Sequence, residues 1–310
     1  MFTTREIIYL TAVPAGVALV ALVAAWRPWR RGVVLRGHWG GAVAAGAAFL
    51  TSYALLDGQV PAWPPAQARH WLFYLAAALT VLGLVDATLG AFVHVPNWLR
   101  GEVALAAAVL VVLFPFSSLL RADAWTAVVA VEWMVGMIVA LHVVWVSAET
   151  LSRRLPRAAA PLVVFVFTSG VALVMMLSGS LVYGRIAGLM AVVSACASVV
   201  SLASPSFSMS RGAVTVIVPV TVAVIYLGYH LVDPGVGVAN GALLLSSLLL
   251  PWLANLPPLR RRRPWVRVLV AVLLAALPVG AAVFRAREAF VRSQQEDRAL
   301  QELYTLRAAR

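Results

Sequence analysis

Long apolar runs separated by short polar gaps dominate the chain. The hydrocarbon core of a bilayer, roughly 30 Å thick, needs about 20 apolar residues of helix, and a backbone in lipid must satisfy its own hydrogen bonds. The runs predict transmembrane helices over residues 7–26, 39–57, 71–93, 102–120, 124–147, 159–183, 186–203, 212–232, 236–255 and 265–284. We therefore predict an all-α fold, a polytopic transmembrane helical bundle of about ten helices.

Composition supports a membrane protein and explains its basic charge. Hydrophobic residues make up 62% of the chain and charged residues 12%, with a mean hydropathy of +0.92, which is far from the balance of soluble domains. The net charge is +12, and all 24 basic residues are arginines, most of them at the ends of apolar runs. Topology signalling explains this distribution better than nucleic-acid binding. The absence of lysine fits a GC-rich bacterial genome, so we expect the bacterial cytoplasmic (inner) membrane.

Arginine falls mainly in every second gap between the runs. One set of gaps, counted with the start of the last run, holds 14 arginines, and the other set holds three, Arg69, Arg121 and Arg185. The larger set is Arg27, Arg30, Arg31, Arg36, Arg100, Arg153, Arg154, Arg157, Arg211, Arg260, Arg261, Arg262, Arg263 and Arg267. Cytoplasmic loops are rich in arginine, so we predict the larger set in the cytoplasm and the N-terminus outside. The six arginines after Phe284 break the asymmetry and leave the side of the C-terminal tail open.

Two segments outside the runs are candidate contacts for a protein partner. Residues 1–284 form the predicted bundle, and residues 285–310 form a short amphipathic C-terminal helix or tail, in which Leu300, Leu303 and Tyr304 have helical spacing. The other segment is the proline-rich loop from Asp57 to Pro65. The alternatives are a simple solvated helical end and a rigid connector.

Ionisable side chains inside apolar runs are the first functional candidates, because charge in a bilayer is costly. Asp86 lies in the third predicted span, and Glu132 and His142 lie in the fifth. If both spans run in the same direction, Asp86 and His142 lie at nearly the same depth. Glu132 lies ten residues before His142, about 15 Å along a helix, so a proton relay needs water or other polar groups between them. We predict a proton or substrate pathway through these three residues; the alternative is structural burial.

A second polar group gathers at the predicted outer mouth of the bundle. Tyr226, Tyr229, His230 and Asp233 lie at the outer end of the eighth span, and Asp57 lies at the outer end of the second. Tyrosine at a membrane interface followed by an aqueous aspartate is also ordinary interfacial chemistry. These five residues are therefore candidates for the outer mouth of a pathway.

The sequence lacks the local signatures of common enzymes. It contains no G-x-x-x-x-G-K-[ST], G-x-G-x-x-G, H-E-x-x-H or G-x-S-x-G motif. The five histidines fall in different segments, and the single cysteine, Cys196, excludes a multi-cysteine site. We predict no catalytic residue, no metal and no cofactor.

The leading interpretation is a permease-like membrane protein that moves a small solute or protons. In length and helix number alone the chain resembles small drug/metabolite-type permeases, which are usually cytoplasmic at both ends, whereas the arginines here place the N-terminus outside. The competing interpretation is a non-transporting membrane subunit or scaffold, and a membrane-embedded enzyme ranks third. Clustering of Asp86, Glu132 and His142 in one water-accessible cavity would favour transport.

Overall fold

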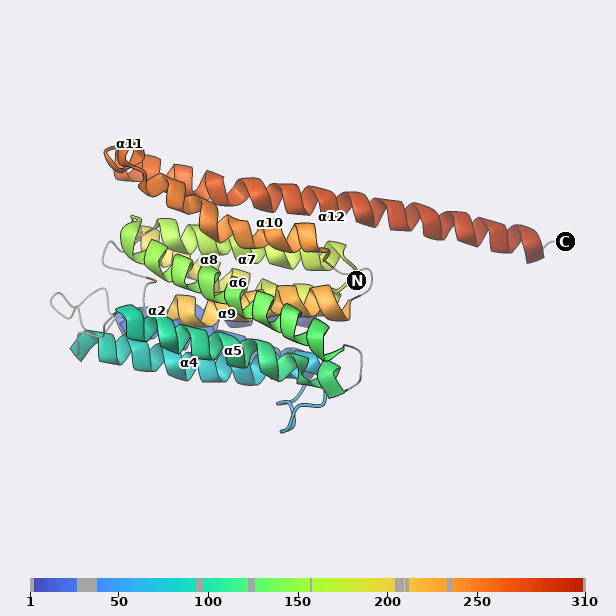
Figure 1. Ribbon diagram of the computed structural model, residues 1–310, viewed down its shortest axis with the longest axis horizontal. Helices are drawn as coiled ribbons and strands as arrows, with labels where there is room; N and C mark the ends of the chain where they lie inside the picture. The colour runs from blue at the N-terminus through green and yellow to red at the C-terminus, as the bar shows by residue number, and fades with distance from the viewer. Residues whose placement is uncertain are drawn as a thin grey trace.

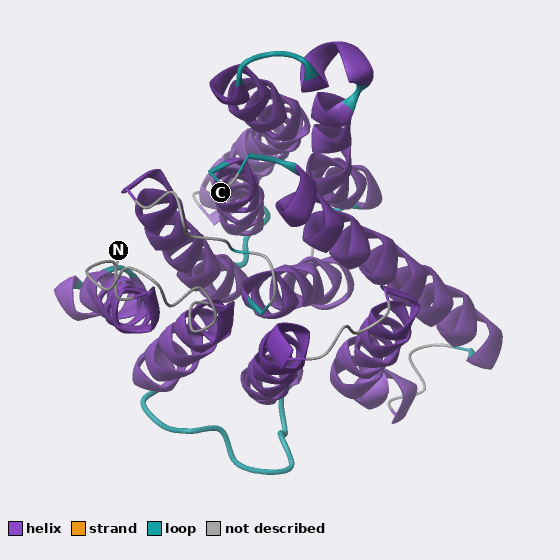
Figure 2. Cartoon of the chain, turned by 90° about the vertical axis from the view of Figure 1, so that its left-hand side faces the viewer, coloured by secondary structure: helices purple, strands orange, loops and turns teal. Residues whose placement is uncertain are grey.

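The fold consists of packed helices. The computed structural model describes residues 3–26, 38–92, 97–121, 126–156, 158–203, 209, 212–232 and 236–308. Within these ranges every regular element is a helix (Figure 2). The helices are α1 (Thr4–Leu10), α2 (Ala12–Trp26), α3 (His38–Asp57), α4 (Ala68–Phe92), α5 (Asn97–Arg121), α6 (Ala127–Arg154), α7 (Ala159–Leu177), α8 (Leu181–Ala203), α9 (Ala213–Leu231), α10 (Val238–Leu249), η2 (Leu250–Asn255), α11 (Pro257–Arg260) and α12 (Pro264–Ala308). The predicted all-α bundle is confirmed.

The number of membrane-spanning segments also agrees with the hydropathy pattern. Among the described residues, ten helical segments are long and apolar enough to cross a membrane. α1 and α2 together form the first of these, and α10 with η2 forms the ninth. The chain is therefore a multi-pass membrane protein.

Apolar side chains cover outward faces of the bundle. On α12, Leu269, Leu273 and Leu277 are 50%, 53% and 69% exposed, and on α6 Val131 and Val135 are similarly exposed. A soluble monomer rarely carries such extended apolar surface, whereas in a bilayer these side chains contact acyl chains. The exposed apolar faces thus mark the lipid-facing surface.

Helix α9 forms the centre of the bundle. It contacts α3, α4, α5, α6, α7, α8 and α10, and every residue from Ala213 to Gly228 is buried. Valine, isoleucine and alanine fill most of this helix, and the hydroxyl of Thr221 donates to the carbonyl oxygen of Ile217 at 2.7 Å. A helix that is apolar all round, with a buried hydroxyl bonded to its own backbone, can be surrounded on all sides.

The two ends of the bundle differ in charge. Both chain termini lie at one end, and α11 lies at the other (Figure 1). Arg260–Arg263 lie in and directly after α11, and the guanidinium of Arg154 at the end of α6 lies over the ring of Trp252, shortly before α11. We call this end the arginine end. Among the described residues, Arg154, Arg260–Arg263 and Arg267 of the larger arginine set thus lie at one end of the folded bundle.

Several predicted boundaries differ from the structure, and two of them have a local cause. The predicted span 159–183 is interrupted by a turn at residues 178–180, where Gly179 has a φ of +89° and the N–H of Ser180 donates to the carbonyl oxygen of Met175 at 3.0 Å. Because apolar residues lie on both sides of this turn, the hydropathy pattern shows one uninterrupted run and gives no sign of the turn. At the other end of the chain, α12 continues through Phe284 to Ala308 as one helix of 45 residues and projects beyond the bundle (Figure 1).

Candidate functional site

Charged side chains gather at the arginine end between α4, α5 and α6. Asp86 lies in the last third of α4, Arg100 in the first turn of α5 and Glu149 near the end of α6. Close packing fixes Asp86, because a Cβ added to Gly83 would lie 2.9 Å from the carbonyl oxygen of Gly212 at the start of α9. Residues three apart share a helix face, so the contact at Gly83 turns Asp86 toward the interior.

Two ion pairs organise these side chains. The Nε atom of Arg100 lies 3.3 Å from Oδ1 of Asp86, and the two side chains are only 12% and 20% exposed. Glu149 accepts a hydrogen bond from Arg153, one turn later on α6, and forms an ion pair with it. Removing such charges from water costs free energy, and ionisable groups within membrane helices are by default functional.

A further arginine ties the end of α6 to its neighbours. The Cζ atom of Arg154 lies 5.3 Å from the ring centroid of Trp252, a cation–π contact. The backbone carbonyl of Arg154 accepts a hydrogen bond from Arg267 at 3.2 Å, and Arg267 also donates to Oδ1 of Asn255 at 3.0 Å. These contacts hold the end of α6 against η2 and α12.

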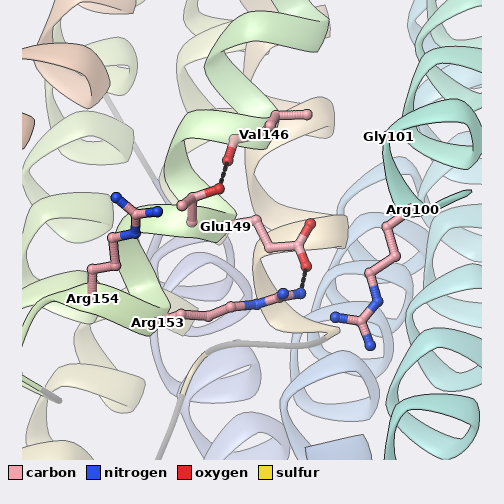
Figure 3. A pocket seen from close by; sticks show the side chains of 7 residues that line it. Arg100, Gly101, Val146, Glu149, Arg153 and Arg154 are labelled. Carbon is pink, nitrogen blue, oxygen red and sulfur yellow. Dashed lines mark hydrogen bonds and ion pairs between the residues drawn. The ribbon is translucent and has the colours of Figure 1, made fainter. Parts of the chain in front are cut away.

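Two adjoining cavities open among these side chains, and we call them the charged cavity and the deep cavity. Their volumes are about 360 Å³ and 180 Å³. The charged cavity is lined by Arg100, Gly101, Val146, Glu149, Thr150, Arg153 and Arg154 (Figure 3). The deep cavity is lined by Leu82, Val85, Asp86, Leu99, Arg100, Val103, Ala104, Trp145, Glu149 and Thr215. Arg100 and Glu149 line both cavities and form the wall between them.

The charges around the two cavities favour an anion. The described lining of the two cavities includes three guanidiniums, from Arg100, Arg153 and Arg154, and two carboxylates, from Asp86 and Glu149, which leaves one net positive charge. Guanidinium is planar and donates in pairs to carboxylate or phosphate oxygens. Figure 3 shows Arg100, Glu149 and Arg153 converging on the same space. The site can therefore bind a small anion, which would compete with the carboxylates for the guanidiniums.

Of the three predicted pathway residues, the structure places Asp86 in this site. His142 is half-buried on α6, and its Nδ1 makes no hydrogen bond within the described part of the chain. Glu132 is exposed on the face of α6 that carries Val131 and Val135. Among the described residues, no hydrogen bond or ion pair joins Asp86 to Glu132 or His142. The pathway through all three residues stays a prediction.

The predicted outer-mouth residues divide into two groups. Asp57 lies 3.4 Å from Nη2 of Arg69 and 3.4 Å from Nε2 of His70, so it closes the proline-rich loop onto α4. Tyr226, Tyr229 and His230 line a separate cavity between α6, α9 and α10. Asp233 lies outside the described residues.

Arg100 and Glu149 are the site residues that hydropathy alone does not reveal. The apolar runs end short of both, so the pattern places them in gaps, whereas α5 begins at Asn97 and α6 continues to Arg154. One local signal was available: Glu149 precedes Arg153 by four residues, the spacing of a helical ion pair. That spacing indicates a longer α6.

The described residues contain no group of three or more His, Cys, Asp or Glu side chains that could hold a metal ion. The chain matches no protein-family model, no curated protein and no solved structure.

Proposed function

We propose that this multi-pass protein is a permease-like carrier of a small anionic solute, a carboxylate or a phosphate. The observation that supports the proposal is the set of three arginines and two carboxylates around adjoining cavities, linked by Arg100 and Glu149. A volume of 360 Å³ is in the size range of small-molecule sites. Small metabolites, rather than macromolecules, fit this space.

Charge balance gives the carrier a physical basis. The site has one excess positive charge, so a bound monoanion makes the whole set neutral. A group of side chains and bound anion with no net charge costs less free energy to enclose in a low-dielectric helical bundle than a group with a net charge. An anion that takes Arg100 from Asp86 also leaves that carboxylate free to accept a proton, which would couple the solute to protons. The proposed substrate and the proposed proton pathway thus share one residue.

Proteoliposomes provide the test of transport. The purified chain is reconstituted, and uptake of labelled acetate, succinate and inorganic phosphate is measured beside internal acidification. We expect at least one anion to enter faster than into empty vesicles, and Arg100→Gln to reduce its uptake about 10- to 100-fold, because a charged hydrogen bond is lost. Uptake equal to that of empty vesicles for all three anions would reject the proposal.

Two further variants separate transport from folding. Gly101 lines the charged cavity, and a Cβ there would meet no atom within 4 Å, so Gly101→Leu fills the cavity while every charge remains. It should abolish uptake in a chain that still runs as a single species on size exclusion. Arg292→Gln removes an arginine that is 75% exposed on α12 and should leave uptake unchanged. Equal uptake by both variants would contradict a role for the cavity.

We also propose that the arginine end faces the cytoplasm of a bacterial inner membrane and that the N-terminus is outside. The positive-inside rule supports this orientation. In a Cys196→Ala background, a cysteine at position 63 should react with an impermeant maleimide in intact cells, and a cysteine at position 261 should not. Reversed labelling would overturn the orientation.

A second candidate function, a non-transporting subunit or scaffold, is favoured by the projecting part of α12. Phe290, Val291 and Tyr304 on α12 are 39%, 43% and 71% exposed. Trp63, 66% exposed in the proline-rich loop, is the other proposed contact. A photo-crosslinking amino acid at position 304 or 63 should give a protein adduct in cells, whereas one at Leu277 on the lipid-facing surface should not. Without such an adduct, the scaffold function fails.

A further inference from the structure

A third cavity lies at the opposite end of α6 from the charged site, and we call it the aromatic cavity. Its volume is about 250 Å³. It is lined by Trp133, Gly136, Met137, Ala140, Ile225, Tyr226, Tyr229, His230, Gly237, Val238, Gly241, Ala242 and Leu245, from α6, α9 and the start of α10. Trp133 and Glu149 are 16 residues apart on α6, or about 24 Å along the helix. The two sites are therefore separate.

The walls of this cavity are aromatic and ordered by ring contacts. The Trp133 ring lies 5.2 Å from the rings of both Tyr229 and His230, and the latter contact is edge-to-face at 88°. Tyr229 and His230 pack edge-to-face at 4.6 Å, and Phe116 also packs edge-to-face against His230 at 5.3 Å. Such ring pairs hold one another in place. These ring contacts thus fix the positions of the aromatic side chains that line the cavity.

Missing side chains create the open space. A Cβ added to Gly136 or Gly237 would meet nothing within 4 Å, and one added to Gly241 would come no nearer than 3.7 Å to Ile225. The floor has little polar capacity, because the hydroxyl of Tyr226 already donates to the carbonyl oxygen of Met137 at 2.8 Å. An occupant therefore gains packing contacts and few hydrogen bonds, which favours hydrocarbon.

The rim of the cavity belongs to the lipid-facing surface. Val238 is 61% exposed and Trp133 is 38% exposed, and the neighbouring Val135 and Val139 on α6 are 53% and 54% exposed. Lipid is the solvent of this surface. The cavity runs from the first residues of α10 inward to Leu245, so a chain that enters beside Val238 points from the interface toward the hydrocarbon core.

Size selects the occupant. A dry cavity of roughly 150 Å³ holds one benzene ring, so 250 Å³ accepts a short length of single hydrocarbon chain and excludes a helix from another protein. We propose that the aromatic cavity is a lipid site, which binds one acyl chain of a membrane phospholipid between α6 and α10 while the headgroup stays at the interface. Lipid binding there does not require that the protein transports anything.

Photo-crosslinking in vesicles tests the site. The chain is reconstituted in phosphatidylcholine and phosphatidylglycerol that contain a small fraction of phosphatidylcholine with a diazirine in one acyl chain, and crosslinked peptides are identified after proteolysis. Crosslinks should concentrate on residues 133–140 and 238–245, about three- to tenfold above Leu269, Leu273 and Leu277 of α12, whose exposed side chains face surrounding lipid. The preference is modest because both environments are apolar and only packing differs.

A matched pair of glycine variants makes the result decisive. Gly136→Leu fills the cavity and should lower the crosslinks on α6 and α10 to the level of α12. Gly280→Leu adds the same side chain at an exposed position on α12, where a Cβ also meets nothing within 4 Å, and should change nothing. Equal crosslinking of all segments, or crosslinking that survives Gly136→Leu in a folded chain, would overturn the lipid site. A co-purified aromatic ligand released by Gly136→Leu would overturn the acyl chain as the occupant.

Discussion

Removing either partner of the Asp86–Arg100 ion pair should have unequal effects on stability. Arg100 Nε lies 3.3 Å from Asp86 Oδ1, and both side chains are largely buried. With an effective dielectric constant of about 20, two unit charges at that distance attract by about 5 kcal/mol. Desolvation of both groups offsets much of this attraction. The loss in the free energy of unfolding of each variant therefore depends mainly on the charge that stays buried without a partner.

Arg100→Met should be the more damaging substitution. Among the described residues that line the deep cavity Arg100 is the only basic one, so its loss leaves Asp86 buried and uncompensated, at a cost of about 3–4 kcal/mol in the free energy of unfolding. In Asp86→Asn, Arg100 still lines the same two cavities as the Glu149 carboxylate, so the cost should be about 1–2 kcal/mol. The double variant, Asp86→Asn with Arg100→Met, leaves neither charge buried without a partner. Its free energy of unfolding should fall by about 2 kcal/mol, which is less than the sum of the two single losses.

Unfolding in mixed micelles measures these differences. The purified variants are titrated with sodium dodecyl sulfate in a mild detergent, and tryptophan fluorescence reports the folded fraction. Adding Glu149→Gln to Asp86→Asn removes the substitute partner of Arg100 and should raise the loss to about 3 kcal/mol. Equal losses for the two single variants, with a double variant equal to their sum, would refute the argument that Glu149 serves as a second partner.

The same titration checks two packing contacts. Gly83→Val should cost about 1–3 kcal/mol, because its Cβ would come within 2.9 Å of the carbonyl oxygen of Gly212. Gly188→Ala on α8 is the control of opposite sign: its Cβ meets nothing within 4 Å, so better helix propensity should stabilise the chain by up to about 1 kcal/mol. Tyr226→Phe should cost about 1 kcal/mol through loss of the hydrogen bond to Met137, and an unchanged midpoint would contradict that bond.

Hydropathy predicts which segments are helices but not where an apolar run turns. The span 39–57 agrees with α3 to within one residue, because polar residues flank it on both sides. The span 159–183 is too long, because a turn at Gly179 needs one residue with positive φ rather than a polar stretch. The last predicted span stops at 284 because charge ends an apolar run without ending a helix; α12 continues to Ala308, through the segment predicted as a C-terminal helix or tail.

The candidate site could be predicted only in part. Asp86 is visible from sequence because a carboxyl within an apolar run is rare and costly. Its partner Arg100 is not, since arginine at a run boundary looks like an ordinary topology signal. Glu132 is also a carboxyl within an apolar run, yet its side chain is exposed on α6. Which side of a helix is buried depends on the helices that pack against it, and the run itself does not show this.

Helices α6 and α9 line both the deep cavity and the aromatic cavity, but the two helices contribute different kinds of side chain. Between Ala213 and Leu231, α9 carries no Asp, Glu or Arg. It contributes Thr215 to the lining of the deep cavity. To the aromatic cavity it contributes the rings of Tyr226, Tyr229 and His230. All charge at the proposed anion site therefore comes from the surrounding helices α4, α5 and α6. If the chain is a carrier as we propose, we expect the movement that changes the site to be a shift of α5 and α6 against the uncharged, buried α9. Such a shift would separate the Asp86–Arg100 ion pair, which joins α4 to α5, without exposing the central helix to water.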